Sequence, residues 1–275
     1  MCRFITFYCE GEQRTTLNRF IRALVESSQN DPYLHMFSKR YRHEHGWGYA
    51  IVCFKEDFST IFFGKSLKPI YNDDLAGKIA EYLEKYEVCL GMVHSRLASK
   101  KEPINIYSTQ PFHHNLGKHG HLWFIHNGSV DKESLAKILD KEELLKTHSD
   151  SYFASLLAAK TIIARQDLIK AVVGVLDYVR TAFNVGVMVL NNNGVKLFTL
   201  NYFTPKIKHF KDYYKLYGVN KWNTKIIASS TIIDFYLKEE LSNAHVFHNG
   251  EAYLWIFKKD IKELVETKIL ISSHA

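Results

Sequence analysis

The order of hydrophobic and polar positions predicts short strands and amphipathic helices. Residues 2–9 alternate loosely and are rich in Phe, Ile, Thr and Tyr, which is typical of a strand. Apolar residues then recur at positions 17, 20, 21, 24 and 25, the spacing of one helix face. Polar residues and Pro32 should end this helix, because proline cannot continue one. The polar stretch from there to Gly46 is predicted to be a loop.

The same criteria predict further elements along the rest of the chain. Strands are expected at 47–54, 60–63, 88–97, 121–125, 185–190, 195–200, 226–228, 244–247 and 253–257. Helices are expected near 75–83, 135–139, 153–163 and 168–179. Asn193-Gly194 and Asn249-Gly250 are each predicted to form a hairpin turn, since Asn-Gly supplies the positive φ that such turns need.

The expected strands fall in antiparallel groups and the helices in runs, which is an α+β pattern and not a regular βαβ alternation. The sequence contains no repeat of 20–50 residues, no low-complexity tract and no Gly/Pro-rich linker. We therefore expect one continuous domain over residues 2–275, long enough to bury a sizeable core.

Composition and charge exclude some classes of function. The chain is 46% hydrophobic and 24% charged, and no apolar run approaches the roughly 20 residues that span a bilayer. The first residues lack the features of a signal peptide, so a soluble, cytoplasmic protein is expected. The net charge of +7 would suit a nucleic-acid partner. Charges of both signs are interleaved, however, and dense basic residues occur only at 39–43 and more weakly at 206–211, so nucleic-acid binding is not favoured.

Cysteine and histidine offer little evidence for a metal site. Cys2, Cys9, Cys53 and Cys89 are widely spread and none forms a CxxC pair, so neither a zinc site nor a disulfide framework is expected. The fourteen histidines have no companion ligands at convincing spacing, so we expect no metal.

Cys2 has two interpretations. It can be a buried cysteine at the edge of a strand. It can also be a nucleophile that becomes N-terminal when Met1 is removed, which usually happens when the second residue is small. The α-amine of such a residue titrates near pH 7.7–8.0 and can serve as the base for its own thiol. Position alone favours the buried cysteine.

Three other stretches carry similar alternatives. Arg96 ends an apolar run, where it can bind a carboxylate or form a structural ion pair. Asn127-Gly128 can be a hairpin turn, or a side-chain amide and a backbone N–H that converge on an oxyanion. Asp150, within Ser149-Asp150-Ser151, can belong to a helix N-cap or bind a ligand ammonium.

In this order, these motifs resemble the type 2 glutamine amidotransferases, which are N-terminal nucleophile hydrolases. The likeness is greatest to stand-alone, glutaminase-like members that begin Met-Cys-Arg. Gly46-Trp47-Gly48, Pro111-Phe112 and the stretch 68–74 also fit their pattern. Specific motifs span about residues 2–160, and 225–230 resembles a later Ala-Ser strand of the family.

The resemblance implies a four-layer αββα sandwich of two antiparallel sheets flanked by helices, with Cys2 at the end of a central strand. It implies that Cys2 attacks the side-chain amide of glutamine or a γ-glutamyl compound, and that Asn127 and Gly128 stabilise the oxyanion. Arg96 would bind the substrate carboxylate and Asp150 its ammonium, with no cofactor. Partners would be this small molecule and, in one version, a separate synthase subunit that accepts ammonia.

Four departures from the family pattern leave the leaving group undefined. They are His45, Gln110, Ser99-Lys100 and Tyr152, where the family often has Asp, His, Thr-His and Glu. Ser99 is still expected to contact the substrate. Two rival hypotheses remain: a non-enzymatic binding or regulatory protein on a degenerate version of the fold, and a basic nucleic-acid binder.

Overall fold

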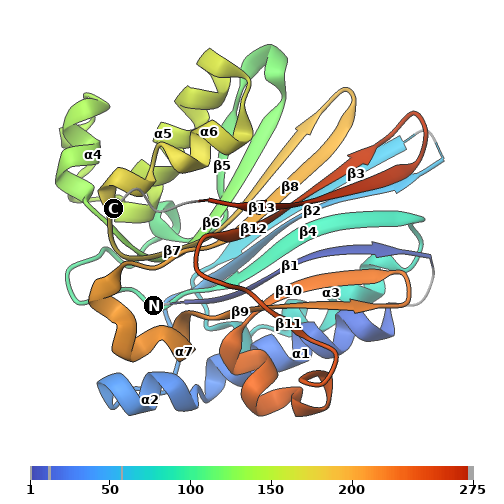
Figure 1. Ribbon diagram of the computed structural model, residues 1–275, viewed down its shortest axis with the longest axis horizontal. Helices are drawn as coiled ribbons and strands as arrows, with labels where there is room; N and C mark the ends of the chain where they lie inside the picture. The colour runs from blue at the N-terminus through green and yellow to red at the C-terminus, as the bar shows by residue number, and fades with distance from the viewer. Residues whose placement is uncertain (1, 12–13, 57, 272–275) are drawn as a thin grey trace. The chain divides into compact units, whose positions relative to one another are not determined.

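The computed structural model describes residues 2–11, 14–56 and 58–271, in which the chain forms two compact units. Unit 1 comprises residues up to Leu97, Thr109–Pro111 and His209–Phe247. Unit 2 comprises Ala98–Ser108, Phe112–Lys208 and the chain from His248 onward. Each unit is built on one antiparallel sheet, so strands distant in the sequence become neighbours (Figure 1). The single domain over 2–275 stays a prediction.

The sheet of unit 1 has the strand order β11-β9-β10-β1-β4-β2-β3. Its strands are β1 (Arg3–Glu10), β2 (Trp47–Lys55), β3 (Phe58–Ser66), β4 (Val88–Ser95), β9 (Leu216–Lys221), β10 (Thr224–Ser229) and β11 (His245–Val246). The N-terminal strand is central, between β10 and β4, and is buried from Arg3 to Cys9. This burial on both faces explains why its apolar alternation is loose.

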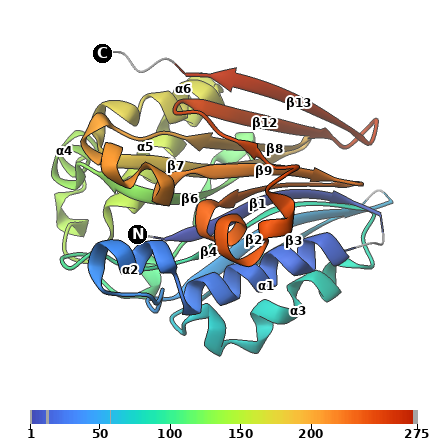
Figure 2. The same ribbon diagram turned by 60° about the horizontal axis from the view of Figure 1, so that its bottom comes forward.

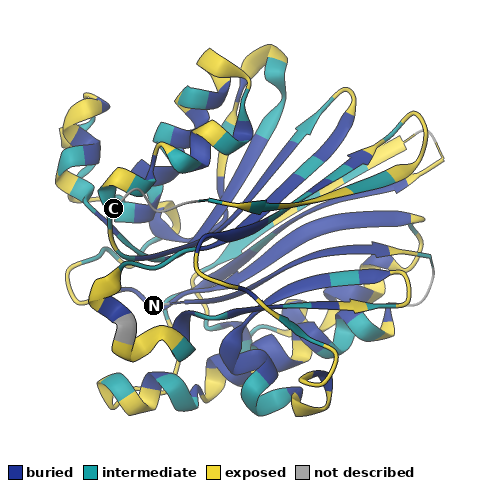
Figure 3. Cartoon of the chain, in the orientation of Figure 1, coloured by how far each residue is buried: buried dark blue, intermediate teal, exposed yellow. Residues whose placement is uncertain are grey.

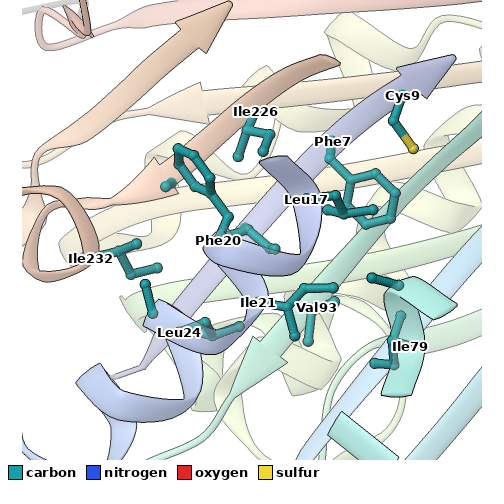
Figure 4. Packing of buried hydrophobic residues seen from close by; sticks show 14 of the residues in the cluster. Phe7, Cys9, Leu17, Phe20, Ile21, Leu24, Ile79, Val93, Ile226 and Ile232 are labelled. Atoms are coloured by element: carbon teal, nitrogen blue, oxygen red, sulfur yellow. The ribbon is translucent and has the colours of Figure 1, made fainter. Parts of the chain in front are cut away.

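Helices α1 (Thr15–Gln29) and α3 (Asp74–Leu83) cover one face of this sheet (Figure 2). The predicted apolar stripe of α1 packs against it, and the cluster combines helix and strand residues (Figure 4). Leu17, Phe20 and Leu24 from α1 join Phe7 and Val93 from the sheet, all fully buried. The periodicity of the first helix therefore predicted its buried face.

The loop predicted from Pro32 to Gly46 is wrong in its first part, because α2 (Pro32–Ser38) forms there. Proline at the first helical position loses no hydrogen bond, and Asp31 caps the helix by accepting from the Leu34 N–H at 3.1 Å. The same proline that ends one helix thus begins the next.

The sheet of unit 2 has the order β13-β12-β8-β7-β6-β5. Its strands are β5 (Phe112–Asn115), β6 (His121–Val130), β7 (Val179–Asn191), β8 (Gly194–Asn201), β12 (Glu251–Lys258) and β13 (Glu263–Leu270). Helices α4 (Lys132–Ile138), α5 (Asp150–Arg165) and α6 (Leu168–Val173) share its apolar cluster. Figure 3 shows the middle strands buried along much of their length, whereas the helices expose one side.

Short helical turns complete the described chain. They are α7 (Lys211–Tyr214), η1 (Ile70–Asn72), η2 (Ile106–Ser108), η3 (Gly117–His119), η4 (Glu142–Leu144), η5 (Leu176–Tyr178), η6 (Pro205–Phe210), η7 (Ile232–Tyr236) and η8 (Lys238–Glu240). The helix predicted over 168–179 is therefore broken into α6 and η5, and Val179 already begins β7.

Two other predictions of elements need correction. Asn249-Gly250 does not connect a hairpin, because β11 pairs with β9 in unit 1 and β12 pairs with β8 and β13 in unit 2. The strands β5, β9 and β13 were not expected. The β13 strand exposes most of its length, which hides the alternation that identifies a half-buried strand.

A disulfide joins Cys53 and Cys89, contrary to the expectation from sequence spacing. The two residues lie directly opposite each other on β2 and β4, and Cys9 lies opposite Cys89 on the other side. Residues paired across antiparallel strands come within disulfide reach whatever their separation in the chain. Spacing along the sequence could not show this.

Two antiparallel sheets flanked by helices confirm the predicted α+β class. Within residues 2–11, 14–56 and 58–271, no helix combines the length and apolar character that crossing a membrane requires.

Candidate active site

Cys2 directly precedes β1 and is buried, with 7% of its surface exposed. Arg3 pairs with Ser95 across the sheet, so continuing this register brings Cys2 opposite Arg96. The thiol lies 3.9 Å from the carbonyl oxygen of Leu97. Two of the predicted residues, Cys2 and Arg96, are therefore neighbours at one end of the unit 1 sheet.

The electrostatic surroundings of Cys2 favour the thiolate. Burial alone would raise the pKa of this thiol. The positive charge of the amino terminus and an interaction with the His94 side chain outweigh burial and lower the pKa well below its usual value. By contrast, burial raises the pKa of Cys9 to about 12, against the smaller effect of Arg14. Cys2 thus has the character of a reactive cysteine and Cys9 that of an inert one.

Arg96 is held by its backbone just beyond β4. Its N–H donates to the Gly46 carbonyl at 2.9 Å, and its carbonyl accepts from the His45 N–H at 3.0 Å. The side chain is 3% exposed. His45 stands where the family often has Asp, and its pKa is lowered by burial and by the charges of Arg96 and Arg40, against Glu44. A neutral imidazole therefore borders the arginine at neutral pH.

Behind Cys2, on the opposite face of β1, lies a fully buried group of charges. Arg3 contacts the Asp31 carboxylate through two nitrogens, Nε at 2.7 Å and Nη2 at 3.2 Å, and His43 Nε2 lies 2.8 Å from the same carboxylate. Arg3 also donates to the Tyr213 carbonyl at 2.9 Å, and Thr231 donates to Asp31 at 2.9 Å. We call Arg3, Asp31 and His43 the Arg3 cluster. It fixes Arg3, the residue next to Cys2, and ties β1 to α2.

The pKa values of the Arg3 cluster predict a protein that loses stability in acid. Burial alone would raise the pKa of Asp31, but Arg3 and His43 lower it below its ordinary range. Burial lowers the pKa of His43, against the opposing effect of Asp31. As the pH falls through about 6.5, the unfolded chain therefore protonates His43 while the folded chain resists, and below about 4 the same holds for Asp31.

We expect the free energy of unfolding, measured with urea at pH 8 to 3.5, to fall as the pH falls. The His43 contribution should have a slope of at most about 1.4 kcal/mol per pH unit, the value for one proton. His43→Gln keeps a donor for Asp31 but cannot titrate, so its decline between pH 7.5 and 5.5 should be shallower. Equal slopes for both proteins in that range would contradict this assignment.

The Gly46-Trp47-Gly48 motif is explained by a close backbone approach. A Cβ on Gly48 would lie 2.4 Å from the Gln110 carbonyl oxygen and 3.1 Å from Pro111. The chain over 109–111 therefore packs directly on this glycine, which joins two stretches that the sequence treats as separate motifs. Trp47 anchors the same strand, because its Nε1 donates to Asp73 at 3.0 Å.

Asn127 and Gly128 lie inside β6, paired with Asn184 and Phe183 of β7. The hairpin-turn interpretation of this Asn-Gly pair is therefore wrong. Gly128 has a φ of +150°, and a Cβ there would come within 1.8 Å of the Ala182 carbonyl oxygen. The register shifts between Gly128 and Val130. A glycine is needed where the ladder is disrupted, and a bulge is a common way to redirect backbone groups.

Asp150 is the first residue of α5, and neighbouring donors hold its carboxylate. Oδ1 accepts from the Ser151 N–H at 2.7 Å and from the Ser151 hydroxyl at 3.1 Å, and Oδ2 accepts from the Val130 N–H at 3.0 Å. Ser149 occupies the N-cap position without a side-chain cap. These hydrogen bonds fix the carboxylate at the N-terminus of α5. The bond from Val130 places it two residues beyond Gly128 along β6.

Glu102 is a second carboxylate beside Asp150. Burial, and then the charge of Asp150, raise the pKa of Glu102, while Lys132 and the Asp150 N–H act in the opposite direction. Lys132 Nζ lies 3.2 Å from Glu102. Two carboxylates and one ammonium thus share this end of α5. Such an acidic pair suits a ligand ammonium.

The structure distributes the predicted residues between the two units. Cys2 and Arg96 belong to unit 1, and Asn127, Gly128 and Asp150 belong to unit 2. Within unit 2, Asp150 is bonded to Val130 of the strand that carries Asn127 and Gly128. Ser99 belongs to unit 2 and is exposed. The roles of all six stay predictions.

Several polar residues around these positions were not predicted as functional. The buried ones include Arg3, Asp31, His43, His94, His126 and Asn184. Glu102, which is partly buried, is another. For Asn184, a signal was available, because a lone amide interrupts the apolar run of β7. The Arg3 cluster joins residues far apart in sequence, so no local pattern could have found it.

Two enzymes are among the solved structures that this structure resembles. One is a glutamine phosphoribosylpyrophosphate (PRPP) amidotransferase from B. subtilis, complexed with ADP and GMP, with a TM-score of 0.59 and 13% identity. The match covers 98% of this chain and 49% of that one. The chain has the fold of about half of a glutamine PRPP amidotransferase. This is the N-terminal nucleophile hydrolase fold of the class II glutamine amidotransferases, as the resemblance implied.

The other similar structure is that of the allosteric regulatory enzyme of purine biosynthesis, with a TM-score of 0.58 and 14% identity. It is also matched over 98% of this chain and 49% of its own. The chain therefore spans about half the length of these relatives. No family model matches the sequence. No curated protein matches it either.

Proposed function

We propose that the protein hydrolyses the side-chain amide of glutamine or of a γ-glutamyl compound. The observation that carries the proposal is Cys2, a thiol at the start of the central strand beside the His94 side chain, which helps to lower its pKa. The similar structures support an enzyme of the glutamine amidotransferase type at the level of fold. The finer assignment rests on the residues.

In the proposed reaction, removal of Met1 gives Cys2 a free α-amine. The amine accepts the thiol proton, and the sulfur attacks the amide carbon of the substrate. The Asn127 amide and the Gly128 N–H donate to the oxyanion of the tetrahedral intermediate. The α-ammonium of Cys2 gives this proton to the leaving nitrogen, and the intermediate collapses to a γ-glutamyl thioester with release of ammonia or an amine. Water then attacks the thioester as the α-amine accepts one of its protons. Glutamate is released, and the α-ammonium returns the proton to the Cys2 thiolate.

Opposite charges would hold the substrate. Arg96 is assigned to the α-carboxylate, for which its planar guanidinium offers two parallel donors. Asp150 is assigned to the α-ammonium, supported by the donors that hold its carboxylate and by the second carboxylate of Glu102. Removing one oxyanion donor in such enzymes typically costs about 3–4 kcal/mol of transition-state stabilisation.

The fate of the ammonia separates two versions of the proposal. The protein can hydrolyse a γ-glutamyl metabolite by itself, or it can supply ammonia to a separate synthase subunit. Comparing turnover of glutamine with turnover of γ-glutamyl amides by the purified chain distinguishes them. Fast hydrolysis of one amide without a partner favours the first version.

A diazo-ketone analogue of glutamine tests the chemistry. The analogue alkylates a thiol that has been activated as a nucleophile, so one adduct should appear on the N-terminal peptide by mass spectrometry. The intact mass of the same sample should lack one methionine. An unlabelled N-terminal peptide in a sample that has lost Met1 would overturn the proposal and favour a binding protein on this fold.

A further inference from the structure

His126 directly precedes Asn127 but projects from the other face of β6. It is paired with Val185, a member of the apolar cluster under the helices, and its ring lies 4.9 Å from that of Phe183. The ring is buried. Since successive side chains of a strand alternate, Asn127 projects from the face opposite the helices.

Hydrogen bonds connect His126 to Asp150. The ring Nε2 lies 3.2 Å from the Ala182 carbonyl oxygen, and Nδ1 lies 2.8 Å from the Ser151 hydroxyl oxygen. The same hydroxyl lies 3.1 Å from Asp150 Oδ1. We call His126, Ser151 and Asp150 the His126 chain.

The hydrogen atoms of the His126 chain can be counted. A carbonyl oxygen only accepts, so Nε2 must carry a proton. In a neutral ring Nδ1 would then accept, and the single Ser151 hydrogen could serve either Nδ1 or the carboxylate, but not both. In the imidazolium, Nδ1–H donates to Ser151 and the Ser151 hydroxyl donates to Asp150. With Asp150 as a carboxylate, only the charged ring satisfies all three of these contacts.

We propose that His126 is an imidazolium and that, through Ser151, it acts as a positioning residue that ties the substrate-binding carboxylate to the oxyanion-binding strand. The inference deepens the proposed function and rests on it for the roles of Asp150, Asn127 and Gly128. His126 itself touches no reacting atom in this scheme.

The charges around His126 agree with this state. Helix α5 contributes Asp150, the segment that follows β4 contributes Glu102, and α4 contributes Lys132, which is paired with Glu102. Strand β7 contributes the Phe183 ring and the Ala182 carbonyl. Lys132 offsets one of the two carboxylates at this end of α5, and a cation at His126 offsets the other.

The Ala182 carbonyl gives the His126 chain its connection to the oxyanion-binding backbone. This carbonyl accepts from His126 and packs so closely on Gly128 that a Cβ would come within 1.8 Å of it. One ring therefore fixes the Asp150 carboxylate through Nδ1 and the backbone beside Gly128 through Nε2. A shift of the Asp150 carboxylate or of the backbone beside Gly128 would break a buried hydrogen bond, which is costly in a protein interior.

The charge state can be measured without substrate. In protein labelled with ¹⁵N at histidine, NMR should show both ring nitrogens of His126 protonated at pH 7, above the ordinary histidine midpoint near 6.5. His126→Gln assigns the signal by removing it. Ser151→Ala should move the titration midpoint down by about one pH unit or more. Ser155→Ala is the control, because it removes a contact at 2.8 Å with a different histidine, His114. The titration midpoint of His126 should not move in this variant.

Kinetics test the positioning role. Ser151→Ala removes the link to Asp150, and His126→Gln keeps a donor for Ala182 but loses the Nδ1 contact. Each should raise KM for the γ-glutamyl substrate about tenfold, since a hydrogen bond to a charged group is lost, with kcat changed about twofold or less. The double variant should be no worse than either single variant, because both break the same chain.

A neutral His126 at pH 7 overturns the inference, as do additive effects in the double variant. The proposed function fails separately: wild-type protein without γ-glutamyl hydrolysis would leave the NMR result intact and remove only the catalytic interpretation. If His126→Gln does not fold, the kinetics of Ser151→Ala alone test the positioning role. A loss of kcat in Ser151→Ala without a change in KM would contradict positioning of Asp150.

Discussion

Cys2→Ala should abolish γ-glutamyl hydrolysis, with a loss on the order of 10³-fold or more in kcat. Removing the nucleophile of a covalent catalyst takes away the pathway itself and not one contact among many. The variant should still bind substrate, because the groups assigned to its carboxylate and ammonium are unchanged. The rate of ammonia release measures the loss of kcat. Mass spectrometry of the quenched reaction shows whether the thioester still forms.

Cys9→Ala is the matched control for Cys2→Ala. Cys9 belongs to the same strand and is fully buried, and its pKa is raised to about 12 by burial. A thiol of that kind is almost wholly protonated near neutral pH. Activity per folded molecule should therefore survive, apart from a small loss of stability. Equal inactivation by the two substitutions would contradict a nucleophilic role for Cys2.

Asp31→Ala should be the most destabilising single substitution in the Arg3 cluster, at about 3–5 kcal/mol of unfolding free energy. Arg3 and Asp31 are both fully buried, so the variant leaves a guanidinium without its counter-charge. It also removes the cap of α2. Urea unfolding monitored by circular dichroism at pH 7.5 gives the value.

Removing both charges tests the explanation. In Arg3→Met with Asp31→Asn, no unpaired charge remains, and the asparagine oxygen can still cap α2. The double variant should therefore be more stable than Asp31→Ala, since a buried ion pair can often be replaced with little loss. A cost below about 1 kcal/mol for Asp31→Ala would show that the pair contributes little.

The parts of the fold that depend on local order could be predicted. The α1 stripe follows from i, i+3, i+4 spacing, and the β7–β8 hairpin follows from Asn193-Gly194. The same local rule failed at Asn127-Gly128. There, pairing with β7 continues the strand through a bulge, so tertiary contacts outweigh the turn preference of the dipeptide.

The order of motifs in the sequence predicted the candidate site residues Cys2, Arg96, Asn127, Gly128 and Asp150. It did not predict the residues that surround and orient them. Glu102 and His126 act on Asp150 from segments separated from it by more than twenty residues. The Cys53–Cys89 disulfide and the Arg3 cluster depend on strand register and on burial. Single-sequence patterns contain neither quantity.

The central position of β1 has a consequence for the synthesis of the chain. The strand is synthesised long before one of its two neighbours, β10. Until Thr224–Ser229 emerges, β1 has an open edge, and such edges invite pairing with other chains. Sheets that depend on such distant pairings also tend to fold slowly. The growing chain should therefore be most prone to aggregation, and most dependent on chaperones, before β10 has emerged.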